Sequence, residues 1–146
     1  MIRQIEEKDR DVYLELTREF YTSSAVDHEI DEQNRIDTFN HLMTDTPYAE
    51  CIIVECDGEC AGYALFAKTF SQEAGGLTVW LEEVYIRESF RSRGLGNEIF
   101  DWTEKRFPDA RRLRLEVEED NVRAIELYKR RGFVPLPYMQ MIKDRQ

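Results

Sequence analysis

The segment CIIVECDGECAGYALFAKTF, residues 51–70, restricts the fold of this chain more than any other stretch. Two apolar runs flank the pair Asp57-Gly58. Asp-Gly between two strand-like runs favours a two-residue hairpin turn, because both turn positions must tolerate positive φ angles. The pattern therefore predicts a β-hairpin, so the fold contains a sheet with at least one antiparallel pair of strands.

The other segments alternate between helical and strand-like patterns. Apolar residues at helical spacing predict helices over residues 9–21, 31–43 and 94–107, and a shorter one over 121–133. Strand patterns cover residues 1–5, 77–86 and 111–117, and extended chain broken by prolines covers 133–142. This order predicts a mixed α/β (α+β) fold with helices packed on a mixed sheet. Since no linker or repeat divides the sequence, residues 1–146 are expected to form one domain.

Composition limits the classes of partner. The net charge of −10 disfavours nucleic acid, because phosphate backbones repel an acidic chain. It would suit a cationic substrate, but an acidic surface also serves solubility alone.

No apolar run approaches the roughly 20 residues that span a bilayer, and no signal segment is evident, so we expect a cytoplasmic protein without a membrane partner. The three cysteines, Cys51, Cys56 and Cys60, lack metal-ligand spacing with histidines, which predicts reduced thiols and no metal.

The stretch RSRGLG, residues 91–96, follows the strand pattern after a short connector and opens a helix. Backbone N–H groups at a helix start lack intrahelical partners, and glycines let an anion come close. A pyrophosphate would fit there, with Arg91 and Arg93 adding charge; the alternative is an ordinary turn with solvated arginines. The Walker ending is missing, and Ile99 occupies the place of the third glycine in the dinucleotide fingerprint.

The remaining pattern, Arg/Gln-x-x-Gly-x-Gly/Ala, is met by Arg91, Gly94 and Gly96. In these residues the sequence resembles the GNAT superfamily of acyl-CoA-dependent N-acyltransferases, whose members bind the coenzyme pyrophosphate in this loop. WLEEVYIRESFRSRGLG is similar to the superfamily's fourth strand and loop, and EEDNVRAIELYKRRGFV to its second signature. One departure is Ser92, where many members have glycine. LEEVYI and LYKRRGF are most similar to diamine and polyamine acetyltransferases.

The resemblance implies a central, mostly antiparallel sheet of about six to seven strands, flanked by about four helices, with strands 4 and 5 splayed apart. It implies acetyl-CoA as co-substrate and direct attack by an amine in a ternary complex, without an acyl-enzyme. Homodimers are common in the superfamily, so a homodimer is expected.

Two residues match the family's catalytic positions. Tyr128 would be the general acid that protonates the departing sulfur, because a phenol is neutral at pH 7. Glu82 would take the amine proton or hold an ammonium group. Strand alternation puts Glu82 and Glu83 on opposite faces, so only one should face a given pocket unless the strand bulges. The alternatives are a core tyrosine and two rim carboxylates.

The coenzyme residues also follow from the resemblance. The backbone of Val84, Tyr85 and Ile86 would pair with the pantetheine arm. Asn121, Ala124 and Tyr128 would line the other side of the coenzyme. The pyrophosphate would be held mainly by backbone N–H groups of Arg91, Ser92, Arg93, Gly94, Leu95, Gly96 and Asn97.

The acceptor site is expected around Glu82 and Glu83 together with the segment FYTSSAVDHEIDE, which contributes Tyr21 and His28. Aromatic and acidic side chains suit a cationic amine, although a solvated charged loop is the simpler interpretation. Three functions remain: an N-acetyltransferase for a small amine such as a polyamine, one for protein termini or lysines, and a non-catalytic acyl-CoA sensor.

Overall fold

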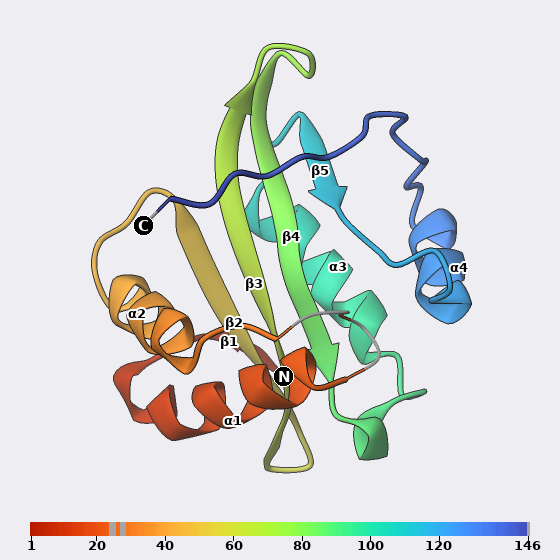
Figure 1. Ribbon diagram of the computed structural model, residues 1–146. Coiled ribbons are helices and arrows are strands. Elements are labelled where there is room, and N and C mark those ends of the chain that lie inside the picture. Colours follow the sequence, from red (N-terminus) through yellow and green to blue (C-terminus); the bar gives the residue numbers. More distant parts are fainter. Residues whose placement is uncertain (24–25, 27–28, 146) are drawn as a thin grey trace.

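The computed structural model describes residues 1–23, 26 and 29–145. Its sheet has five strands in the order β1-β2-β3-β4-β5 (Figure 1). β1 to β4 are antiparallel neighbours, and β5 is parallel to β4. The predicted mixed, mostly antiparallel sheet is therefore confirmed. The bounds are β1 (Ile2–Gln4), β2 (Ala49–Cys56), β3 (Glu59–Ser71), β4 (Gly76–Ile86) and β5 (Arg112–Leu115).

The predicted number of six to seven strands exceeds what the described residues form. The segment 133–145 contains no strand and crosses the molecule as extended coil (Figure 1). Pro135 and Pro137 lie two apart in this segment. Proline has no N–H to donate to a ladder, so this alternating pair weakens pairing along one edge of the segment.

Four α-helices flank the sheet, as predicted, with bounds within two or three residues of those expected. They are α1 (Arg10–Tyr21), α2 (Glu32–Leu42), α3 (Leu95–Arg106) and α4 (Val122–Arg130). Two short 3-10 helices, η1 (Glu7–Asp9) and η2 (Glu88–Phe90), precede α1 and follow β4. Local side-chain caps fix two of the starts: Asp31 accepts from the Gln33 N–H at 3.0 Å, and Asn121 caps α4.

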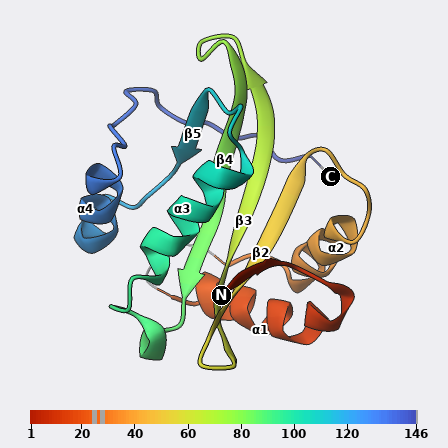
Figure 2. The same ribbon diagram turned by 180° about the vertical axis from the view of Figure 1, so that it is seen from behind.

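The sheet separates two apolar cores. Neighbouring residues of β2 alternate between them: Ile53 packs with Tyr13 and Tyr63 under α1 and α2, while Ile52 packs with Ile99 under α3. Figures 1 and 2 show α1 and α2 on one face and α3 on the other. β2 and β3 are buried on both faces, which explains their nearly continuous apolar sequence.

The predicted hairpin joins β2 and β3. Asp57 has a φ of 53° and Gly58 a φ of 78°, so both turn residues adopt the left-handed region that a two-residue turn of this kind needs.

β4 and β5 separate part-way along their length. They pair only between Thr78–Leu81 and Arg112–Leu115, whereas β4 continues to Ile86. The chain leaves β5 toward α4, away from β4 (Figure 1). The predicted splay is thus present, and within the described part of the chain no strand pairs with this side of β4 beyond Leu81.

Candidate active site

A β-bulge lies at the point where β4 loses its neighbour. Opposite β3, Leu65 faces Glu83 and Phe66 faces Leu81, so Glu82 is an extra residue. A bulge turns consecutive side chains toward one side, which simple alternation would not do. Glu82 and Glu83 both line one small cavity of about 60 Å³. The expectation that only one of them faces a pocket therefore does not hold, and the bulge is the reason.

The cavity lies in the gap between the splayed strands. Two carboxylates come from β4, and Tyr128 comes from α4. Leu81 and Leu115 form its floor where the strands still pair. The remaining lining residues are Phe20, Val84, Glu116, Val117, Glu118 and Asn121. The two residues expected to be catalytic, Glu82 and Tyr128, are thus brought together from segments 46 positions apart in the sequence.

Glu83 is held by two tyrosines. Tyr63 donates a hydrogen bond from its hydroxyl to Glu83 Oε1 at 2.7 Å, and Tyr21 donates to Oε2. Burial raises the pKa of Glu83 above its ordinary value, although the two hydroxyls oppose this by stabilising the carboxylate. Burial and the neighbouring Glu83 raise the pKa of Tyr21, which therefore remains a neutral donor. Two of the expected acceptor residues, Tyr21 and Glu83, are in direct contact.

Glu82 has no hydrogen-bond partner in the described part of the chain. Its side chain reaches solvent at the edge of the cavity. Desolvation by the surrounding protein, followed by repulsion from Glu83 and Glu116, raises its pKa. A carboxylate whose pKa lies closer to neutrality is a stronger base, which is the property that proton removal from an amine requires.

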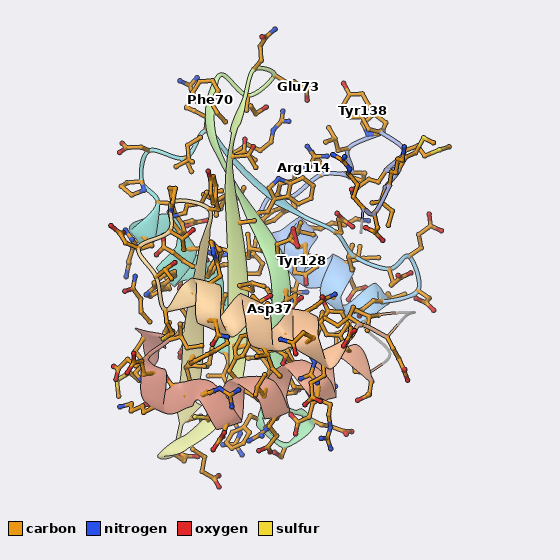
Figure 3. The ribbon with its side chains drawn as sticks, turned by 60° about the vertical axis from the view of Figure 1, so that its left-hand side comes forward. Asp37, Phe70, Glu73, Arg114, Tyr128 and Tyr138 are labelled. Atoms are coloured by element: carbon orange, nitrogen blue, oxygen red, sulfur yellow. The ribbon has the colours of Figure 1, made fainter. Side chains whose placement is uncertain are left out.

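Tyr128 faces these carboxylates from α4. Its ring packs against Phe100 and Phe133, with centroids 5.7 Å and 6.1 Å away. Burial raises the pKa of the phenol, so it stays protonated at neutral pH. Among described residues the hydroxyl has no partner, so its proton can be donated to a group in the cavity. Figure 3 shows Tyr128 where α4 approaches β4.

The loop between η2 and α3 has the geometry expected of an anion cradle. Ser92 has a φ of 65° and Gly94 a φ of 80°, so two left-handed residues bring successive N–H groups to one side before α3 begins. A Cβ on Gly94 would meet no heavy atom within 4 Å, which leaves room beside the backbone. A Cβ on Gly96 would lie 3.0 Å from Leu127 Cδ2, so this glycine also serves packing between α3 and α4.

The two loop arginines have other partners. Arg93 forms a 3.0 Å ion pair with Asp57 and lies over the Phe90 ring. Arg91 donates from Nε to the Ile86 carbonyl at 2.9 Å. Of the other loop residues, Leu95 is buried and Asn97 is exposed, so Leu95 can offer only its backbone.

The ladder decides which backbone groups of β4 face the gap. The Arg87 N–H donates to the Ala61 carbonyl of β3. Tyr85, two residues before Arg87 on β4, stands opposite Tyr63 of β3. Because ladder bonds alternate along an antiparallel pair, the backbone groups of Tyr85 point to β3, and those of Val84 and Ile86 point to the gap. Tyr85 backbone pairing with a pantetheine arm is therefore not available in this register; its ring instead packs against Phe20 and Tyr63.

Asn121 stands at the other wall of the gap. Its Oδ1 accepts from the Ala124 N–H at 3.4 Å, and no other described residue bonds to this side chain, so both amide protons can donate. The observed helix cap and the predicted ligand contact thus use different atoms of one side chain. His28 lies outside the described residues.

Sequence reasoning missed Arg123. This residue of α4 donates a hydrogen bond to Ser92 Oγ in the loop. The signal was present: a cation in the first turn of a helix is opposed by the helix dipole and is therefore unusual.

Comparisons with known proteins identify the relatives of this chain. Residues 10–133 match the model of the Acetyltransferase (GNAT) family. Thialysine N-epsilon-acetyltransferase of Bos taurus is 30% identical over 145 residues, which covers 90% of this chain and 82% of the relative. A putative [ribosomal protein bS18]-alanine N-acetyltransferase of Bacillus subtilis is 31% identical over 106 residues, which covers 68% of this chain and 63% of the relative.

The fold is also found among solved structures. The crystal structure of a possible acetyltransferase from Clostridium difficile 630 superimposes on this chain with a TM-score of 0.83 at 17% sequence identity. The match covers 100% of this chain and 97% of the Clostridium difficile chain. This likeness shows the fold: a sheet with a bulged fourth strand, a splayed fifth strand and a glycine loop between strand and helix.

The chain belongs to the GNAT family of acetyltransferases. It is an acetyl-CoA-dependent N-acetyltransferase. The residues present fit that co-substrate, since the gap offers unpaired strand backbone, a left-handed loop and the free amide of Asn121. Within the described ranges, no helix is long and apolar enough to cross a membrane, and no three metal-ligating side chains are grouped.

Proposed function

We propose that the protein transfers the acetyl group of acetyl-CoA to a primary amine of a small cationic molecule, such as a diamine or polyamine, by direct attack in a ternary complex. One observation carries the proposal: Glu82, Glu83 and Tyr128 line the same cavity between β4 and β5. A base, a second carboxylate and an acid in one cavity are the groups that aminolysis of a thioester needs.

Each group has one task. Glu82 removes a proton from the acceptor ammonium, so that the neutral amine can attack the thioester carbonyl. Tyr128 donates its proton to the sulfur as the carbon–sulfur bond breaks, and its phenolate then takes the second proton from the nitrogen that has become the amide. Tyr21 donates a hydrogen bond to Glu83. The hydroxyl oxygen of Tyr21 and the carboxylate oxygens of Glu83 still have lone pairs, which can accept hydrogen bonds from the acceptor nitrogen. The three cysteines take no part, because no acyl-enzyme is formed.

An open groove supports a small, cationic acceptor. It lies on the α1 side of β4, measures about 640 Å³ and includes Glu19, Tyr85 and Glu88. This volume is within the range of roughly 300–1,000 Å³ that is common for small-molecule sites. Arg87 also lines the groove and pairs with Glu19 at 3.0 Å, so the two carboxylates and one guanidinium of the lining leave one net negative charge. Carboxylates at the groove and in the cavity would attract an acceptor with more than one positive charge.

The test is a panel of amines assayed for thiol release from acetyl-CoA. It contains putrescine, spermidine, thialysine, an aminoglycoside and amino acids. We expect turnover with acceptors that carry two or more ammonium groups and little with neutral amino acids. If no amine of the panel causes thiol release while calorimetry shows that CoA binds, the small-amine proposal is refuted.

Two other functions were expected from the sequence: acetylation of a protein acceptor and non-catalytic sensing of acyl-CoA. A protein acceptor is supported by the similarity to the Bacillus subtilis relative, and peptides with free N-termini or lysines are therefore included as acceptors. The non-catalytic sensor has no support, because the chain belongs to an acetyltransferase family and Glu82 and Tyr128 supply a base and an acid in one cavity.

Two further proposals concern the cellular state. The three cysteines are free thiols, which is compatible with the reducing cytoplasm that we propose as the location. We also propose a homodimer, supported by exposed apolar side chains after α4, among them Val134, Met139 and Ile142. Sedimentation at several protein concentrations tests the dimer, and a monomer at every concentration would refute it.

A further inference from the structure

A side-chain contact joins the two walls of the gap between β4 and β5. Arg123 belongs to α4, which follows β5, and its guanidinium donates a hydrogen bond to Ser92 Oγ. Ser92 belongs to the loop that follows β4 and η2. The guanidinium of Arg123 therefore lies beside the loop N–H groups, at the end of the gap where a pyrophosphate is expected.

This position is unfavourable for Arg123 in the protein alone. Asn121 is the N-cap of α4, so Arg123 is the second helical residue, close to the positive end of the helix dipole. The first turn of α4 contains no acidic residue, and Arg123 forms no ion pair within the described part of the chain. Its side chain is exposed. The same position becomes favourable when a multivalent anion lies between α4 and the loop.

The other two arginines at the loop are less available. The Arg93 guanidinium is paired with the Asp57 carboxylate at 3.0 Å. Arg91 donates to the Ile86 carbonyl, 2.9 Å away, which anchors its side chain along β4. Among the residues that the structure describes, Arg123 bonds only to a neutral hydroxyl, and a phosphate oxygen is a stronger acceptor than a hydroxyl oxygen.

We propose that Arg123 is a coenzyme-binding residue whose guanidinium exchanges Ser92 Oγ for oxygens of the coenzyme pyrophosphate. The inference rests on the acetyl-CoA-dependent function proposed above, and it adds a side-chain contact to a site otherwise built from backbone N–H groups. The planar guanidinium can donate two parallel hydrogen bonds to phosphate oxygens, which lysine cannot.

Calorimetric titration tests the assignment with two ligands, CoA and dephospho-CoA, which lacks the 3′-phosphate. The variants are Arg123→Ala and Arg123→Lys, and the control is Arg130→Ala, which removes an exposed arginine from the far end of the same helix. We expect Arg123→Ala to weaken both ligands by about tenfold, as for loss of a charged hydrogen bond at an exposed site. Arg123→Lys should recover part of this loss, and Arg130→Ala should change the affinity by less than about twofold.

Each other outcome has a definite meaning. Equal affinity of wild type and Arg123→Ala would overturn the inference. A loss seen with CoA and absent with dephospho-CoA would overturn it as well, because Arg123 would then hold the 3′-phosphate. A wild-type protein that binds neither ligand would refute the proposed function itself, so the two failures are distinguishable. Circular dichroism melting of each variant shows that it is folded before titration.

Discussion

Replacing Tyr128 by phenylalanine removes one hydroxyl and leaves the helix intact. The ring contacts with Phe100 and Phe133 remain, and the hydroxyl has no hydrogen-bond partner within the described residues. We therefore expect the free energy of unfolding to change by less than about 0.5 kcal/mol. A general acid contributes about 100- to 10,000-fold to a rate, so kcat should fall by that factor, which corresponds to about 2.7–5.5 kcal/mol of activation free energy.

The assay measures thiol release from acetyl-CoA with a saturating amine acceptor, and calorimetry measures CoA affinity separately. Tyr48→Phe is the matched control, because Tyr48 is 67% exposed and lies before β2, away from the cavity. For Tyr128→Phe we expect unchanged CoA affinity together with the large loss in kcat. For Tyr48→Phe we expect neither quantity to change.

Two results would refute the reasoning. If kcat of Tyr128→Phe stays within about twofold of wild type, another group or water protonates the sulfur. If kcat and CoA affinity fall together by the same factor, the hydroxyl positions the coenzyme and has no role as an acid.

Three further predictions follow from the same geometry. Glu82→Gln should lower kcat/KM near neutral pH, with activity partly recovered at high pH. The wild-type rate should rise with pH as Glu82 ionises through its raised pKa, and the variant should lack this rise; a wild-type profile without it would contradict the base role. Gly94→Val, strained at a φ of 80°, should weaken CoA binding more than Arg93→Ala does, and calorimetry showing the reverse order would indicate that side-chain charge dominates. Gly62→Ala would place a Cβ 2.1 Å from Tyr85 O and should destabilise by about 3 kcal/mol in urea unfolding, whereas an unchanged midpoint would contradict this packing.

Local chemistry made most of the fold predictable. Asp57-Gly58 identified a turn whose positive φ angles few other pairs tolerate, and apolar spacing located α4 within three residues of its bounds. The cavity could be predicted as far as Glu82 and Tyr128, since each stands in a motif of its own.

The bulge at Glu82 could not be predicted from the two glutamates alone. It depends on the register between Leu65 and Glu83, which is set by contacts along the whole length of β3 and β4. The same holds for Tyr85, whose backbone direction follows from that register. The Arg123–Ser92 contact joins residues 31 positions apart, and no local pattern specifies it.

The early end of β5 has a thermodynamic consequence. Because β5 pairs with β4 only as far as Leu81, the backbone of Val84 and Ile86 forms an open sheet edge inside the molecule. A pantetheine arm that paired there, as the family resemblance implies, would complete the sheet and would link binding to folding. A ligand present at 100 times its Kd stabilises the folded state by about 2.7 kcal/mol. The resistance of this enzyme to unfolding and to edge-to-edge aggregation would then rise and fall with the supply of its own acetyl donor.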